Sequence, residues 1–485
     1  MPLSRRDFLR RSATASAGLL VGGPLQMLAA RLSCAANPKA LAAPGYGPLE
    51  RDPAGLLDLP KGFQYRALST AILGSDSDPR FTQKLTNGEL VPARHDGMAA
   101  FAGPGGVTVL VRNHELIPGH SPAVDPGNRR RYDRLGTGGT TTLWVDANRN
   151  LVRAFPSLSG TFRNCAGGPT PWGSWLSAEE CVYMPGRPDP VIDDLRSDVS
   201  ERHGYMFEVD ARAEDLVDPS PIKAMGRFYH EAVAVDPATG DVYLTEDRPH
   251  GLLYRYRPDI VTSGAKRAAD LAVGDLARGG VLEALRIPEH PAAQTQNWKQ
   301  RTFETGKVWA VDWVKIPVID PDVDSEKVFP RGEPKPAATS TRAQGFALGA
   351  TQFARCEGIA LHQGSLYFCA TSGGREEAGQ VWRLDLAAQR LSLMLEPDDR
   401  GLLDGPDNIA PAPNGDLIVC EDGDEEDCVR GVTPGGRIYT LARNAYNRGE
   451  FAGACFSPDG RTMFVNMQDP GITFAIWGPW DRRRA

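Results

Sequence analysis

Residues 231–256 read EAVAVDPATGDVYLTEDRPHGLLYRY, and this stretch has the pattern of three short β-strands. An apolar run follows Glu231, a turn with Asp-Pro and Gly comes next, and a second apolar run ends in Glu246 and Asp247. A third run begins at Gly251 and ends in aromatic residues. Short runs of β-branched and aromatic residues bounded by Gly, Pro and Asp are typical of strands. The stretch therefore predicts a unit whose first strand begins, and whose second strand ends, with an acid.

The same unit recurs along the chain. Clear copies cover residues 357–384, 407–440 and 453–477, and two weaker copies cover residues 96–145 and 165–209. Units of three or four strands, roughly 40–50 residues long, are typical of propeller blades. The 52 glycines and 39 prolines also favour an all-β fold with many turns. We therefore predict an all-β protein folded as a six-bladed β-propeller.

The N-terminus resembles a bacterial export signal. The motif SRRDFLR at residues 4–10 precedes a weakly apolar run, as in substrates of the twin-arginine export machinery. The run is too short and too weakly apolar for a stable membrane span. We predict a signal at residues 1–40 and a periplasmic or extracellular location.

The rest of the chain is predicted to form one domain. Residues 41–90 are expected to be an extension that packs on the propeller, and residues 91–485 the propeller itself, with an insertion at 257–350. The alternative is a split into two domains at this insertion, but each half would then be an open ring with exposed sheet edges.

Composition excludes several classes of protein. Removing residues 1–39, which carry six positive charges and one negative charge, changes the net charge from −7 to −12. An acidic protein is disfavoured as a nucleic-acid partner. Eight cysteines in 485 residues do not make a disulfide scaffold, although some of them could pair after export.

A separate expectation concerns the oligomeric state: we expect the protein to be a monomer.

The repeat places polar residues at two matching sets of positions. The first set, at the start of the first strands, is Asp96, Cys165, Glu231, Glu357, Asp407 and Gly453. The second set, at the end of the second strands, is Glu115, Glu179/Glu180, Glu246/Asp247, Ser372, Glu421/Asp422 and Asn466. Because the first strand of each propeller blade lines the central channel, both sets are predicted to converge there.

So many acids around one axis cannot all stay ionised without cations, because close like charges repel strongly. Carboxylate oxygens suit Ca²⁺, whereas a lone thiolate among oxygens suits a softer ion such as iron. The pattern therefore predicts a metal cluster in the channel. The alternative for each acid is a solvated cap at a blade turn. Of two adjacent acids, alternation along the strand lets only one face the axis.

Residues 161–181, TFRNCAGGPTPWGSWLSAEEC, carry the cysteine of the first set. The glycines and prolines exclude a helix and predict a turn followed by a strand that ends in acids. Cys165 has an ordinary alternative, a buried thiol that only packs. Its place in the repeat favours the metal channel.

Several of these motifs occur together in one known family. They are NCAGGPTPWGSWL at 164–176, NHE at 113–115, GGTTTL at 138–143, YHEA at 229–232, TED at 245–247 and R-x-EG at 355–358. From about residue 90 to its end, the chain resembles the PhoX alkaline phosphatases. The resemblance implies a six-bladed propeller whose channel holds iron and calcium ions, and phosphomonoesterase activity. It also implies that Cys165 binds iron, that Glu231 and Glu357 bind metal, and that Arg355 helps to hold the phosphate.

We therefore hypothesise a secreted, metal-dependent phosphatase acting on small phosphate esters, with Arg355, Glu357 and Cys165 as catalytic residues. The predicted ligands of Fe³⁺ and Ca²⁺ are Cys165, Glu115, Glu179, Glu180, Glu231, Glu246, Asp247, Glu357, Asp407, Glu421 and Asp422. A Gly-x-Ser-x-Gly motif is absent, which disfavours a covalent serine route.

Other residues and other functions stay open at this point. His114 and His230 neighbour predicted ligands, and either support those ligands or have a purely structural role. Arg112, Arg163 and Arg248 are candidates for further phosphate contacts, but surface ion pairing is the favoured interpretation for each of them. A calcium-dependent lactonase of the gluconolactonase type uses a similar propeller with one metal. A calcium-stabilised secreted protein without enzymatic activity is the third hypothesis.

Overall fold

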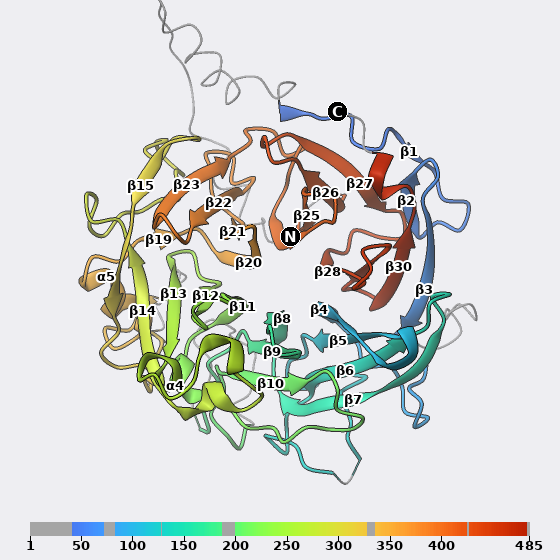
Figure 1. Ribbon diagram of the computed structural model, residues 1–485, viewed down its shortest axis with the longest axis horizontal. Coiled ribbons are helices and arrows are strands. Elements are labelled where there is room, and N and C mark those ends of the chain that lie inside the picture. Colours follow the sequence, from blue (N-terminus) through green and yellow to red (C-terminus); the bar gives the residue numbers. More distant parts are fainter. Residues whose placement is uncertain are drawn as a thin grey trace, which may run out of the picture.

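The computed structural model describes residues 41–71, 83–127, 129–186, 199–326, 335–423 and 426–482. Within these residues, six antiparallel sheets stand around a common axis as the blades of a propeller (Figure 1). The predicted all-β, six-bladed fold is confirmed. The predicted export signal at residues 1–40 lies outside the described residues.

The first three blades follow one another along the chain. Blade one contains β4 (His95–Ala102), β5 (Thr108–His114), β6 (Gly138–Val145) and β7 (Leu151–Thr161). Blade two contains β8 (Asn164–Pro169), β9 (Ser174–Glu179) and β10 (Met206–Asp210). Blade three contains β11 (His230–Val235), β12 (Val242–Glu246), β13 (Gly251–Pro258), β14 (Gly280–Arg286) and β16 (Asp312–Lys315).

Each of the last three blades includes one or two strands from an earlier part of the chain. Blade four contains β20 (Cys356–His362), β21 (Ser365–Ala370), β22 (Gln380–Asp385), β23 (Arg390–Leu395) and β15 (Val308–Ala310). Blade five contains β24 (Pro406–Pro411), β25 (Leu417–Glu421), β26 (Cys428–Val432), β27 (Ile438–Asn444), β2 (Leu57–Pro60) and β1 (Leu49–Glu50). Blade six contains β28 (Phe451–Phe456), β29 (Thr462–Met467), β30 (Ile472–Trp477) and β3 (Gln64–Thr70).

The two ends of the described chain meet in the last two blades. Strand β3 pairs with β30, so an N-terminal strand completes the blade that the C-terminal strands began. Strand β2 pairs with β27 in blade five. This pairing covers the outer edges of both blades and closes the ring, which removes exposed edges that would otherwise pair with other chains.

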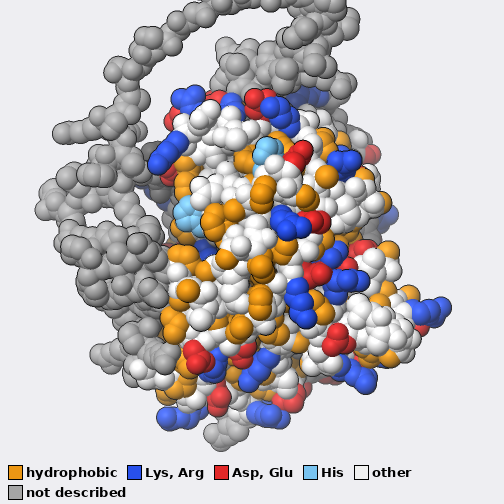
Figure 2. Space-filling model, turned by 90° about the vertical axis from the view of Figure 1, so that its left-hand side faces the viewer, with side chains coloured by type: hydrophobic (Ala, Val, Ile, Leu, Met, Phe, Trp, Pro, Cys, Tyr) orange, Lys and Arg blue, Asp and Glu red, His pale blue; other side chains and the backbone are white. Residues whose placement is uncertain are grey.

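The segment at 257–350 contributes to two blades. Strands β14 and β16 extend blade three and β15 extends blade four. The segment also contains β17 (Ser325–Glu326), β18 (Lys335–Pro336) and the helices α4 (Asp259–Thr262) and α5 (Thr341–Ala347). Figure 2 shows the side of the molecule that these outer elements form, where acidic and basic side chains are interspersed with apolar ones.

Apolar side chains hold the blades together face to face. Each pair of neighbouring blades shares one apolar cluster, because a strand side chain that points out of its sheet meets the next sheet. Buried members of one cluster that come from two neighbouring blades are Leu110 and Phe464, Val111 and Phe207, Leu176 and Leu244, Leu253 and Phe368, Val381 and Val419, and Ile418 and Val465. The core is therefore a ring of six interfaces around the channel.

The cysteines do not crosslink this ring. All seven cysteines among the described residues are free thiols, and six of them are buried. In the part of the chain that the structure describes, no helix combines the length and apolar character needed to cross a membrane.

Candidate metal centre

The inner strand of every blade carries a β-bulge near the end that opens on the channel. The register with the second strand shifts directly after His95, Asn164, His230, Cys356 and Pro406 in blades one to five. In blade six it shifts after Ala452. A bulge adds one residue and re-aims its side chain. In blades one to five, the re-aimed residues are the axial residues that the repeat predicted: Asp96, Cys165, Glu231, Glu357 and Asp407.

Glycines let neighbouring inner strands approach at these bulges. A Cβ atom at Gly97 would lie 2.5 Å from Cα of Ala166 in the next blade. A Cβ atom at Gly358 would lie 2.6 Å from the carbonyl oxygen of Asp407. Any side chain at these positions would push the two strands apart, so glycine keeps the ring narrow.

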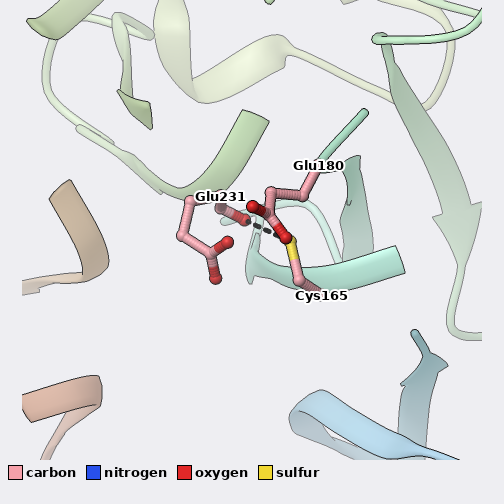
Figure 3. Close-up of side chains that lie close together, drawn as sticks. All are labelled: Cys165, Glu180 and Glu231. Carbon is pink, nitrogen blue, oxygen red and sulfur yellow. Dashed lines mark hydrogen bonds between the residues drawn. The ribbon is translucent and has the colours of Figure 1, made fainter. Parts of the chain in front are cut away.

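The narrow ring gathers the axial side chains into three groups that could hold a metal ion. In each group the potential ligand atoms lie within 4.8 Å of one another. The groups are Cys165, Glu180 and Glu231; Glu231, Glu357 and Asp407; and Asp96, Glu115 and Glu450. Figure 3 shows the first group, in which the Cys165 thiol and the Glu180 carboxylate point toward each other beside Glu231. Glu231 belongs to two groups, so it connects blades two, three, four and five.

The electrostatics of these groups favour bound cations. Burial, and then the charge of Glu115, raise the pKa of Asp96 to about 7, and burial raises the pKa of Glu180 to about 8. Burial followed by neighbouring carboxylates raises the pKa values of Glu231, Glu357, Asp407 and Glu450 well above the ordinary range. Such carboxylates ionise together only when nearby positive charge offsets their repulsion. The donor set of oxygens with one sulfur therefore fits metal ions.

Three predicted ligands lie away from these groups. Glu179, Glu246 and Glu421 are the first members of the adjacent acid pairs, and each is buried inside its own blade. Glu246 accepts hydrogen bonds from Tyr254 Oη (2.9 Å) and Arg342 Nη1 (3.1 Å). Glu421 accepts hydrogen bonds from Arg430 Nε (2.8 Å) and from two backbone amides. Because their oxygens are used within the blades, we leave these three residues out of the proposed ligand set.

Glu179 belongs to a buried ionic triad. Its carboxylate contacts His203 Nδ1 at 2.6 Å and accepts the amide hydrogens of Phe162 and Gly204. On the other side, His203 Nε2 lies 3.2 Å from Asp133. Burial lowers the pKa of His203, but the two carboxylates outweigh it and raise that pKa to about 9. The triad therefore fixes the loops behind blade two.

The second members of the pairs lie toward the axis, and arginines pair with two of them, Glu180 and Asp247. Arg355 donates to Asp247 through Nε (2.8 Å) and Nη2 (2.9 Å), and Nη2 also donates to Glu357 (2.6 Å). Asp422 lies within hydrogen-bonding reach of Glu450. Asp247 and Asp422 thus border the metal groups and position the charged residues around them.

Arg163 has the corresponding role on the other side of the channel. Its Nη2 pairs with Glu115 at 2.8 Å and with Glu180. Gln468 Nε2 donates to both Asp96 and Glu115 at 2.9 Å. The prediction of a surface ion pair for Arg163 is wrong, because its partners Glu115 and Glu180 belong to the metal groups.

The sequence pattern missed one member of the ring in blade six. The repeat aligned Gly453 with the other axial residues, whereas the structure places Glu450 in the third group. Glu450 lies directly before strand β28, at a position that the repeat did not consider, whereas the repeat selected only residues next to the bulge. The motif RGEFAG does contain the acid, directly before the strand.

Several polar residues near the site have structural roles. His114 bonds to the Ala93 carbonyl and to Thr141 Oγ1, both at 2.8 Å. Arg112 is fully buried and bonds to Ser69, Thr141 and Thr473. It therefore links blade one to blade six, and its burial excludes the predicted surface ion pair. The carbonyl of His230 lies 3.4 Å from Cys165 Sγ, which accounts for its place beside the first group.

Comparison with known proteins identifies a matching family. The family model described as alkaline phosphatase PhoX matches residues 44–471. No curated protein matches the chain.

Solved structures give two similarities of different strength. PhoX from Pseudomonas fluorescens, in complex with vanadate as a transition state analogue, is 17% identical with a TM-score of 0.60. The match covers 87% of this chain and 96% of that one. A gluconolactonase from Xanthomonas campestris is 13% identical with a TM-score of 0.37, over 89% of this chain and 98% of that one. The first likeness supports the fold, and the second carries no argument.

The His203 triad predicts a specific dependence of stability on pH. The folded-state pKa of about 9 lies above the unfolded value of 6.5, so the stabilisation is complete below pH 6.5 and is lost as the pH rises through 9. Urea unfolding of the wild type at pH 6 and pH 10 should show a loss from this group on the order of 3 kcal/mol. In His203→Gln this component should be missing, although that variant is less stable at pH 6. Equal pH slopes in the two proteins would contradict a protonated His203.

Proposed function

The chain belongs to the PhoX family of alkaline phosphatases, and from this premise we propose that it hydrolyses phosphate monoesters at metal ions held by its axial side chains. The observation that carries the proposal is the convergence of Cys165 and the axial carboxylates into three groups around one axis. Arg163 and Arg355 lie next to the same groups, and a guanidinium group is suited to binding phosphate. Substrates are expected to be small phosphate esters.

The chemistry of the groups suggests which ions they hold. Cys165, Glu180 and Glu231 offer one thiolate among oxygens, which favours Fe³⁺. The other two groups offer only carboxylate oxygens, which favour Ca²⁺. Glu231 is shared, so the first and second ions would be neighbours.

Bound cations would stabilise the charge that develops on the phosphoryl oxygens and on the leaving oxygen. The protein's own contribution is to bind and orient the substrate. Arg355 is held by Asp247 and Glu357 through Nε and Nη2, so its Nη1 has no carboxylate partner among the described residues. A guanidinium group fixed in this way can donate to a phosphate oxygen without further ordering.

We also propose that the protein acts in the periplasm or outside the cell after twin-arginine export. The support is the SRRDFLR motif at residues 4–10 together with the family. A monomer and the absence of a nucleic-acid partner stay predictions.

Metal analysis of the exported, untagged wild type tests the proposal directly. We expect bound iron and calcium by mass spectrometry, and hydrolysis of p-nitrophenyl phosphate that a calcium chelator abolishes. Gluconolactone is the parallel substrate. A protein without metal and without phosphatase activity would contradict the proposal, and lactone hydrolysis with calcium alone would favour the lactonase.

The adjacent acids Glu179 and Glu180 provide a matched pair of variants. Glu180→Gln should lower the metal content and reduce kcat/KM about a hundredfold, because even groups behind metal ligands contribute 10–100-fold. Glu179→Gln should keep the metal content per folded molecule but lose about 1–3 kcal/mol of stability, because His203 loses its ionic partner. Metal analysis and urea unfolding of both variants separate the two roles. The reverse pattern would assign the metal to Glu179.

Cys165→Ala should remove the iron and reduce phosphatase activity about a hundredfold or more, while the fold survives. Cys455→Ala is the control, because Cys455 is also a free thiol on an inner strand but lies outside the three groups. It should keep iron and activity. Full activity and iron in Cys165→Ala would exclude the thiolate as a ligand.

A further inference from the structure

The residue directly before each inner strand occupies the same backbone position in all six blades. Its carbonyl accepts a hydrogen bond from the amide that follows the second strand, over 2.8–3.2 Å. The six residues, in blade order, are Arg94, Arg163, Tyr229, Arg355, Gly405 and Glu450. One of them, Glu450, belongs to the third metal group, and arginine occupies three of the others.

The three arginines share a backbone conformation that favours glycine. Arg94, Arg163 and Arg355 have φ angles of 53°, 44° and 57°, and Gly405 has 61°. Blade five shows that glycine satisfies the geometry without strain. A strained residue that recurs at equivalent positions around a site points to a function for its side chain.

Arg94 differs from the other two in its partners. Arg163 and Arg355 are each bound by two axial carboxylates. Among the described residues, no carboxylate forms an ion pair or hydrogen bond with the guanidinium group of Arg94. Its Nε is buried without a hydrogen-bond partner, as is the Nε of Arg163. Its guanidinium group therefore has more unused donors than that of Arg163 or Arg355.

The position of Arg94 places it opposite Arg355. Strand β4, which follows Arg94, and strand β20, which follows Arg355, lie on opposite sides of the channel (Figure 1). Arg94 lies on the same side as Arg163, since both lower the pKa of His120, after the larger effect of burial. An anion on the axis would therefore meet guanidinium groups from both sides.

We propose that Arg94 is a substrate-binding residue that donates hydrogen bonds to the phosphoryl oxygens, opposite Arg355. The inference rests on the proposed function of the channel. The phosphate of a monoester carries up to two negative charges and several acceptor oxygens, which suits a free guanidinium fork. Arg94 was not among the residues that the sequence pattern selected, because only the ring geometry shows its equivalence to Arg355.

Arg94→Gly tests the proposal, because glycine removes the side chain and relieves the backbone at once. A loss of charge-assisted hydrogen bonds should raise KM for p-nitrophenyl phosphate and the inhibition constant of inorganic phosphate about tenfold to a hundredfold. Calorimetric titration of the protein with inorganic phosphate should show the same factor without turnover. Thermal stability should not fall, and Arg94→Lys should recover only part of the affinity.

Arg149→Gly is the matched control. Arg149 is also a left-handed arginine, with φ at 65°, but it lies in the turn between β6 and β7 and stacks on Trp477. This variant should keep the wild-type KM and phosphate affinity. This control shows whether replacing any left-handed arginine with glycine changes phosphate binding, or whether the change occurs only at a channel position.

Two outcomes would overturn the inference. One is an Arg94→Gly protein with wild-type KM and phosphate affinity. The other is an Arg94→Gly protein that loses metal with unchanged phosphate affinity, which would mean that Arg94 only offsets the charge of Asp96. A wild type that hydrolyses no phosphate ester but binds phosphate through Arg94 would contradict the proposed function alone.

Discussion

The repulsion among buried carboxylates is the constraint on which this structure depends. The inner strands and the residues next to the strand ends bring acids from all six blades to one axis, and the resulting groups have ligand atoms within 4.8 Å of one another. In a buried site such charges are strongly unfavourable unless cations or arginines offset them. Arg163 pairs with two of these acids, and Arg355 pairs with Glu357 and with Asp247 beside them. The arrangement of side chains in the channel therefore depends on the arginines and bound cations that offset the negative charge of the carboxylates.

Two geometric features decide which acids take part. The bulge in each inner strand turns one residue toward the axis, and the alternation of the second strand turns only the second acid of each pair toward it. The first acids point into the blades, where Glu246 binds Arg342 and Glu179 binds His203. The same motif thus builds the metal site with one acid and stabilises its own blade with the other.

Much of this was predictable from the repeat, and the failures have definite causes. The start of each apolar run located Asp96, Cys165 and the axial acids of blades three to five, because a repeated unit occupies equivalent positions. The choice between adjacent acids was not predictable, since it depends on where each strand ends. Glu450 was missed because it lies directly before the inner strand of blade six, whereas the repeat selected only residues next to the bulge. The partner of Glu246 is Arg342, 96 residues away on α5, and no local pattern indicates such a contact.

The distribution of ligands links the site to the closure of the ring. The first group joins blades two and three, the second joins blades three, four and five, and the third joins blades six and one. The third group exists only when blade six lies beside blade one, and strand β3 completes blade six from the N-terminal side. An ion that binds there stabilises the closed ring, because an unfolded chain offers no such set of ligands. The closed ring in turn holds the carboxylates so close together that their repulsion is relieved when the ion binds. Metal binding and closure of the propeller are therefore two parts of one equilibrium.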